Sequence, residues 1–150
     1  MKHFFKSILI CFLPSLSGVI SKPGEWYLSL NRPPLNPPGW VFGPVWTILY
    51  SMMGISLFLI SQQTESAERS RALRFFYLQL FLNACWTPAF FGLHKMGLAL
   101  LILFLLIVSI IATIVQFIKI RKVAGWLLLP YLIWCCFAFY LNLGYLVLNN

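Results

Sequence analysis

The stretch GLALLILFLLIVSIIATIVQFI, residues 97–118, contains no charged residue and decides the class of protein to which this chain belongs. A helix needs about 20 apolar residues to cross the hydrocarbon core of a bilayer, and this run meets that length. The rest of the chain agrees, because 61% of its residues are hydrophobic and 9% are charged. In soluble domains, roughly a quarter of the residues are charged. The sequence therefore predicts an integral membrane protein.

Four more apolar runs accompany this one and predict a bundle of five transmembrane helices in a single all-α domain, residues 1–150. The expected helices cover approximately 4–20, 41–61, 73–93, 97–118 and 124–148. The first run follows Lys2 and Lys6 as a signal peptide would, but no clean small-x-small cleavage site follows it, so we expect a retained helix. The link 21–40 holds five prolines and is expected to lack regular helix.

The distribution of Lys and Arg predicts the orientation of the bundle. The amino terminus and the second and fourth links together carry eight basic residues, whereas the other side carries three, Lys22, Arg32 and Lys95. Because cytoplasmic loops are enriched in Lys and Arg, we expect a cytoplasmic amino terminus and an outside carboxyl terminus. The net charge of +8 thus lies in short clusters beside the bilayer and indicates no nucleic-acid partner.

Three of the predicted helices carry a stripe of aromatic and amide side chains at helical spacing. The stripes are Trp46, Tyr50, Met53 and Leu57; Gln79, Asn83, Trp86 and Phe90; and Tyr131, Trp134, Ala138, Asn142 and Tyr145. Converging stripes of this kind suit a cavity for a large, flat, mostly apolar ligand. They also suit a packed core in which Asn83 and Asn142 hydrogen-bond between helices, and spacing alone leaves both interpretations open. The fourth run is almost purely aliphatic over 99–108, so we expect it to face lipid or another subunit.

The sequence lacks the residues that several kinds of transport and catalysis require. All three glutamates lie in links, which counts against an ion-coupled pump with a carboxylate inside the membrane. No Ser/His/Asp or Cys/His set, phosphate loop or pair of acids is present. The four cysteines form no CxxC, so they indicate small buried hydrophobic residues. We predict no conventional catalytic residue, no metal site and no covalently bound cofactor.

Three motifs resemble the TspO / translocator protein (tryptophan-rich sensory protein) family. They are EWYLSLNRPPLNPPGWVFGPVWTILYSMMGISLFLI at 25–60, LFLNACWTPAFFG at 80–92 and LLLPYLIWCCFAFYLN at 127–142. Their order matches the family's first link and its second, third and fifth helices. The resemblance implies a five-helix bundle, commonly a homodimer, in a bacterial-type cell membrane, with a cavity capped by the first link.

The resemblance also implies a receptor or sensor that binds porphyrins such as protoporphyrin IX, linked to tetrapyrrole metabolism or a stress response. Some relatives bind sterols, but Tyr140 and Tyr145 are followed by no basic residue here, so the sterol motif is absent. Taken together with the stripes, the resemblance predicts ten ligand-binding residues. They are Trp26, Tyr27, Trp46, Tyr50, Asn83, Trp86, Phe90, Trp134, Ala138 and Asn142.

Two other functions remain open. One is light-dependent oxidative breakdown of bound porphyrin, proposed for some bacterial relatives, in which Trp26 and Trp134 would be the redox-active rings. The other is transport of porphyrin or another amphiphile. Basic residues near the cavity mouth, Lys22, Arg32 and Lys95, would meet either porphyrin propionates or lipid headgroups.

Overall fold

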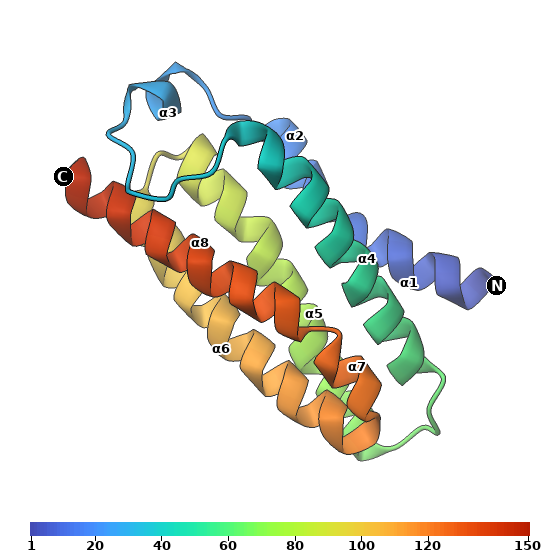
Figure 1. The fold of residues 1–150 in the computed structure, drawn as a ribbon. Helices are drawn as coiled ribbons and strands as arrows, with labels where there is room; N and C mark the ends of the chain where they lie inside the picture. Colours follow the sequence, from blue (N-terminus) through green and yellow to red (C-terminus); the bar gives the residue numbers. More distant parts are fainter.

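The computed structural model describes residues 1–150, and it is all-helical without a β-strand. The long helices run side by side, and the loop that carries α3 covers one end of the bundle (Figure 1). The elements are α1 (Lys2–Phe12), α2 (Ser15–Ile20), α3 (Glu25–Ser29), η1 (Gly39–Val41), α4 (Phe42–Ser61), α5 (Ala67–Thr87), η2 (Pro88–Gly92), α6 (Met96–Ile120), α7 (Lys122–Trp126) and α8 (Leu129–Leu148).

Four helical segments are long and apolar enough to cross a membrane: Lys2–Ile20, Gly39–Ser61, Met96–Ile120 and Lys122–Leu148. Helix α5 is less apolar than these four, although it packs along the whole bundle against α6. Two of its polar side chains, Gln79 and Asn83, lower its hydropathy and are buried inside the protein. Its first turns are charged, and it begins at Ala67 rather than at Leu73, because Ser66 caps it by accepting a hydrogen bond from the Arg69 amide at 3.1 Å.

Prolines mark the interruptions in the long helices. Pro14 separates α1 from α2, and Pro88 begins a π-helical turn at the end of α5. Pro130 lies just after Leu127 and Leu128, where α7 gives way to α8. Each proline lacks the amide hydrogen that regular helix would use, so the backbone changes its path next to it.

One expectation about the links was wrong, and one about the faces of the helices was incomplete. The link 21–40 is not free of regular helix, because α3 forms in its proline-free part after Gly24. The aliphatic fourth span does not face only lipid or another subunit. Its Leu103 and Leu106 are buried in the bundle, while Leu101 is 55% exposed on another face. The central position of α6, between α5 and α8, requires one face of it to pack inside the protein.

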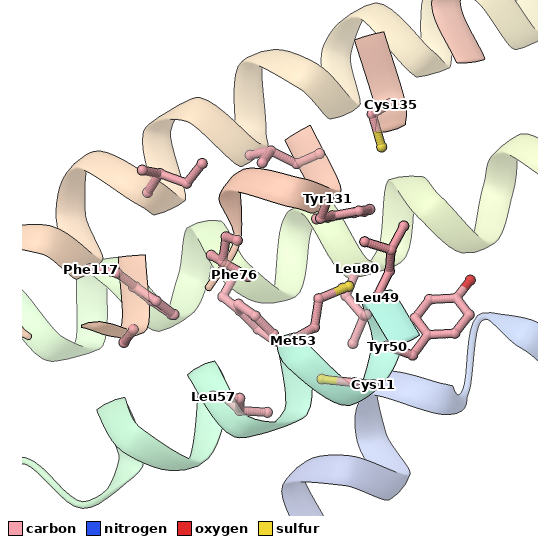
Figure 2. Close-up of a cluster of buried hydrophobic side chains, with 14 of the residues drawn as sticks. Cys11, Leu49, Tyr50, Met53, Leu57, Phe76, Leu80, Phe117, Tyr131 and Cys135 are labelled. Atoms are coloured by element: carbon pink, nitrogen blue, oxygen red, sulfur yellow. The ribbon is translucent and has the colours of Figure 1, made fainter. Parts of the chain in front are cut away.

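The main core lies where α1, α4, α5, α6 and α8 meet. Met53 from α4 and Phe76 from α5 are fully buried there, and Phe76 stacks on Phe117 of α6 with ring centroids 5.6 Å apart. Figure 2 shows Cys11 from the first span in the same cluster, with Cys135 from α8 near Tyr131. Both thiols are free and buried, as expected for small hydrophobic residues, whereas Cys85 is half-buried and Cys136 is exposed, so the expectation of four buried cysteines holds for two of them.

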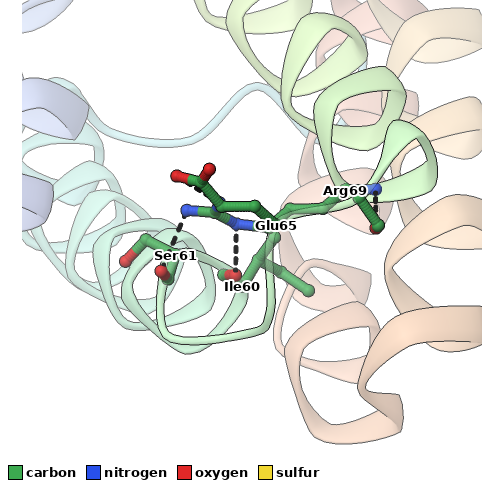
Figure 3. Close-up of polar contacts among 5 residues, drawn as sticks. Ile60, Ser61, Glu65 and Arg69 are labelled. Carbon is green, nitrogen blue, oxygen red and sulfur yellow. Dashed lines mark hydrogen bonds and ion pairs between the residues drawn. The ribbon is translucent and has the colours of Figure 1, made fainter.

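A guanidinium joins the end of α4 to the beginning of α5. Arg69 donates through Nε to the carbonyl of Ile60 (3.2 Å) and through a terminal nitrogen to the carbonyl of Ser61 (3.0 Å), as Figure 3 shows. Glu65 approaches the same guanidinium at 3.8 Å, but its side chain is 96% exposed. Arg69 therefore gives the Ser61 carbonyl a donor at the end of the helix and adds a second donor to the Ile60 carbonyl, which also accepts from the Gln63 amide at 3.0 Å.

Candidate ligand cavity

A cavity of about 570 Å³ lies between α2, α4, α5, α6 and α8 beneath the α3 loop. This volume is within the ~300–1,000 Å³ typical of pockets that enclose small organic ligands. It is lined by 22 residues, none of which is charged. They are Phe12, Pro14, Ser15, Gly18, Ser21, Pro23, Tyr27, Gly39, Phe42, Gly43, Trp46, Thr47, Tyr50, Asn83, Trp86, Thr87, Phe91, Leu103, Leu106, Trp134, Cys135 and Ala138.

A chain of hydrogen bonds supports the inner wall of the cavity. The Tyr50 hydroxyl donates to Asn83 Oδ1 at 2.9 Å, and Asn83 Nδ2 donates to the Tyr131 hydroxyl at 2.9 Å. Tyr131 in turn donates to Gln79 Oε1 at 2.8 Å. The chain fixes side chains from α4, α5 and α8 relative to one another, so the wall is built before any ligand arrives.

Aromatic rings form the sides of the cavity. Trp46 stacks on Tyr50 with centroids 5.1 Å apart and planes at 28°. Trp134 of α8 packs edge-to-face against Phe42 of α4, with ring centroids 5.9 Å apart. Trp86 contributes a third indole, and its Nε1 donates to Asn142 Oδ1 at 3.0 Å, which holds the ring in one orientation. Fixed rings of this kind offer flat, apolar contact area to a planar molecule.

The structure brings seven of the ten predicted binding residues to the cavity. They are Tyr27, Trp46, Tyr50, Asn83, Trp86, Trp134 and Ala138. The helical spacing of the stripes already placed six of these on facing helices, and Tyr27 reaches the cavity from the loop that covers it.

The other three predicted residues lie outside the cavity wall. Phe90 is buried in a second, smaller core, where it stacks on Trp86 with centroids 5.4 Å apart. Asn142 stands behind Trp86 and donates to the Met96 carbonyl at 3.0 Å, so it supports the wall without lining it. Trp26 stacks on His94 at 4.1 Å and meets the edge of Phe90 at 5.8 Å. Of the two rings considered for photo-oxidation, only Trp134 lines the cavity.

Charged groups stay away from the cavity. Lys22, Arg32 and Lys95 are exposed, and none of them lines it. His94 is exposed in the turn before α6, has φ 55° and carries Trp26 stacked on its ring. No group of three or more His, Cys, Asp or Glu side chains is placed to hold a metal ion. The cavity can therefore offer stacking, dispersion and a few neutral hydrogen bonds, and no charge.

Residues of α2 line the cavity although sequence reasoning did not select them. Ser15, Gly18 and Ser21 all belong to the wall, together with Pro14. Their spacing of three residues places them on one helical face, and this face of small residues inside an apolar run was the available signal. The aromatic stripes drew attention to large side chains, which is why the small ones were missed.

The loop above the cavity is tied to the end of α8. Asn149 accepts from the Asn31 amide through Oδ1 (2.8 Å) and donates through Nδ2 to the Asn31 carbonyl (3.0 Å). The Tyr140 hydroxyl donates to the Pro34 carbonyl at 3.0 Å. Pro33 packs so closely on Gly144 that a Cβ added to this glycine would lie 2.5 Å from the Pro33 Cβ. We call residues 30–36 the strap, because these contacts hold them against α8.

Comparison with known proteins supports the resemblance that the motifs indicated. The model of the TspO/MBR family matches residues 7–148. A tryptophan-rich sensory protein from Cereibacter sphaeroides is 38% identical over 146 residues, which cover 97% of this chain and 90% of that protein. A tryptophan-rich protein TspO from Chlorobaculum tepidum is 41% identical over 130 residues, covering 85% of this chain and 82% of the relative.

Similarity extends to animal proteins. A translocator protein from Bos taurus is 40% identical over 138 residues, covering 87% of this chain and 82% of its own length. The apolar helices agree with a protein of the membrane, and the bacterial relatives support a bacterial-type membrane. Because both the family model and these relatives match nearly the whole chain, this protein is a member of the TspO/MBR family of membrane proteins.

Proposed function

We propose that this protein is a membrane receptor or sensor that binds a porphyrin such as protoporphyrin IX, or a related flat hydrophobic molecule, in the cavity between α4, α5 and α8. The observation that carries the proposal is the uncharged cavity of about 570 Å³ with the fixed rings of Trp46, Trp86 and Trp134 in its walls. A planar macrocycle gains dispersion and stacking contacts against such rings.

The amide of Asn83 gives this cavity a polar point deep inside. Its two hydrogen bonds, to Tyr50 and Tyr131, give both hydroxyls a partner, so a mostly apolar ligand leaves neither hydroxyl unpaired. The anionic propionates of a porphyrin would stay outside this uncharged space, because burying an unpaired carboxylate is costly. We therefore propose that the macrocycle lies within the walls with its charged edge toward the loop end.

The proposal is tested by titrating purified protein with protoporphyrin IX in the dark and following tryptophan quenching. We expect saturable binding by the wild type and weakening by roughly tenfold in Trp134→Phe/Asn83→Ala, because both changes alter the wall. Trp126→Phe is the matched control, since Trp126 is 59% exposed at the end of α7 and does not line the cavity. Non-saturable quenching that is equal in all three proteins would mean that the porphyrin only partitions into detergent, and it would reject the proposal.

We also propose the finer topology that the charge distribution predicts, with α5 as a fifth transmembrane segment. The low hydropathy of α5 comes from its charged first turns and from Gln79 and Asn83, and these two amides are buried in the protein interior rather than facing lipid. Buried polar groups with partners inside the bundle are compatible with a helix that spans the bilayer. Five spans would put the two termini on opposite sides of the membrane, and the distribution of Lys and Arg favours a cytoplasmic amino terminus and an outside carboxyl terminus. The homodimer that the family resemblance implies is likewise a proposal.

A further inference from the structure

The walls of the cavity differ in their exposure. The residues that α5, α6 and α8 contribute are buried or half-buried. By contrast Ser15 and Gly18 of α2, and Gly43 and Thr47 of α4, line the cavity and are exposed on the outer surface. A residue that borders both an internal space and the surface lies at an opening, so the cavity reaches the surface between α2 and the amino-terminal half of α4.

The rims of this opening carry small side chains, from Ser15 and Thr47, or none, at Gly18 and Gly43. At both Gly18 and Gly43 an added Cβ would have no neighbouring atom within 4 Å. Where two helices pack closely, an added Cβ would clash with the neighbouring helix. At Gly54 of α4, for example, it would lie 2.8 Å from the Cα of Ile8. The first span thus packs closely on α4 below the cavity and leaves a gap beside it.

The depth of the opening determines the phase it faces. Gly18 and Ser15 lie in the candidate span that ends at Ile20, and Gly43 and Thr47 lie in the span that begins at Gly39. At ~1.5 Å per residue, these four positions are roughly 3 to 12 Å inside the span ends. With the ends of these spans taken as the edge of the hydrocarbon core, positions at that depth face the acyl chains of one leaflet rather than water.

The loop end of the cavity is only partly covered, because Pro23 and Gly39 line the cavity and are exposed there. The strap, residues 30–36, lies over the loop end and is held to α8 by the paired Asn31 and Asn149 and by the bond from Tyr140 to Pro34. Entry from water beneath the strap would require these contacts to break, whereas entry between α2 and α4 requires none of them to break. Side entry also suits a flat apolar molecule, which concentrates in the bilayer.

We propose that the ligand enters and leaves the cavity laterally from the bilayer, through the opening bounded by Ser15 and Gly18 on α2 and by Gly43 and Thr47 on α4. The ligand class is a planar, mostly apolar molecule dissolved in one leaflet. The inference rests on the proposed function, because it describes how the ligand of that cavity reaches it. On this proposal, Gly18 and Gly43 control how fast the ligand enters and leaves the cavity, whereas the aromatic walls determine how tightly it binds.

The test compares Gly18→Leu/Gly43→Leu with the wild type in proteoliposomes. Protoporphyrin IX is added in the dark, and tryptophan quenching gives the rates of association and dissociation as well as the equilibrium affinity. We expect both rates to fall by about tenfold in the variant with a much smaller change in affinity, because side chains at a gate impede passage in both directions. Gly97→Leu is the matched control, since Gly97 is equally open and exposed but does not line the cavity.

The outcomes separate the two proposals. Saturable wild-type binding with unchanged rates in the double variant would reject lateral entry and leave the binding cavity intact. Faster dissociation in that variant would also reject it, because this result means that the leucines only reduce the cavity. Faster exchange in Asn149→Ala, which frees the strap, would reveal entry from water instead. Absence of saturable binding in the wild type would reject the proposed function itself, and lateral entry with it.

Discussion

Asn83 and Asn142 show how single amides organise this bundle. Asn83 joins a tyrosine of α4 to a tyrosine of α8, and Asn142 joins Trp86 of α5 to the backbone at the beginning of α6. The cavity and the interhelical glue, which looked like alternatives on spacing alone, therefore coexist. Asn83 belongs to both, whereas Asn142 acts only behind the wall.

Arg69 gives a prediction at the same scale. Arg69→Ala should lower the free energy of unfolding by about 1.5–3 kcal/mol, because two carbonyls at the end of α4 lose a charged donor. Glu65→Ala should leave stability unchanged within error, since its ion pair is long and its side chain is almost fully exposed. Thermal unfolding in detergent, followed by circular dichroism, measures both. Equal losses in the two variants would show that the ion pair, rather than the carbonyl contacts, joins α4 to α5.

At the scale of helices, the contact between α1 and α4 depends on Gly54. The backbone of Ile8 approaches this glycine so closely that any side chain would have to displace α1. Cys11 is fully buried on the same span and reports whether α1 stays in place. By comparison α5 and α6 pack along most of their length, so no single residue controls their contact.

We predict that Gly54→Leu moves α1 away from α4 and destabilises the protein by about 1–3 kcal/mol, as overpacking usually does. Maleimide labelling of Cys11, quantified by peptide mass spectrometry, should rise in this variant. Gly97→Leu, which adds the same side chain in open space, should leave Cys11 protected. Protection of Cys11 in both variants would show that α1 tolerates the side chain without moving.

For the whole molecule, the main question is how many times the chain crosses the bilayer. Figure 1 shows the carboxyl terminus at the end of the bundle that the α3 loop covers, with the amino terminus far from it. Four segments qualify as spans by composition, and α5 runs beside them with its polar groups inside. For a given position of the amino terminus, the link before α6 lies in one compartment if the chain crosses five times and in the other if it crosses four times. The same holds for the link after α6.

The topology prediction uses Lys95→Cys and Lys119→Cys, each in a background whose four native cysteines are alanine. With five spans and a cytoplasmic amino terminus, a membrane-impermeant maleimide added to intact cells should label position 95 only. Position 119 should react only after permeabilisation, which also serves as the control for reactivity. The reversed pattern would reject five spans with a cytoplasmic amino terminus, and with that terminus in the cytoplasm it would mean that α5 does not cross the membrane.

Much of the candidate site could be anticipated from residue types and their spacing. Trp46, Tyr50, Asn83, Trp86 and Trp134 were selected because rings and amides recur on one face of an apolar helix, and that regularity places them together. Phe90 had the right spacing, yet it turns into the second core, since the π-helical turn that begins at Pro88 changes the direction of the side chains after it. Spacing assumes a regular helix and fails where the helix is irregular.

The sequence by itself determined the helical membrane architecture and the family, because apolar length and motif order are local properties of the chain. Only the tertiary structure decided that Leu103 of the aliphatic span faces inward, that Trp26 pairs with His94 outside the cavity, and that Gly18 stands at an opening. These outcomes depend on which helices become neighbours and how closely their backbones approach. Such distances are set by packing across the whole bundle, and no segment taken alone contains them.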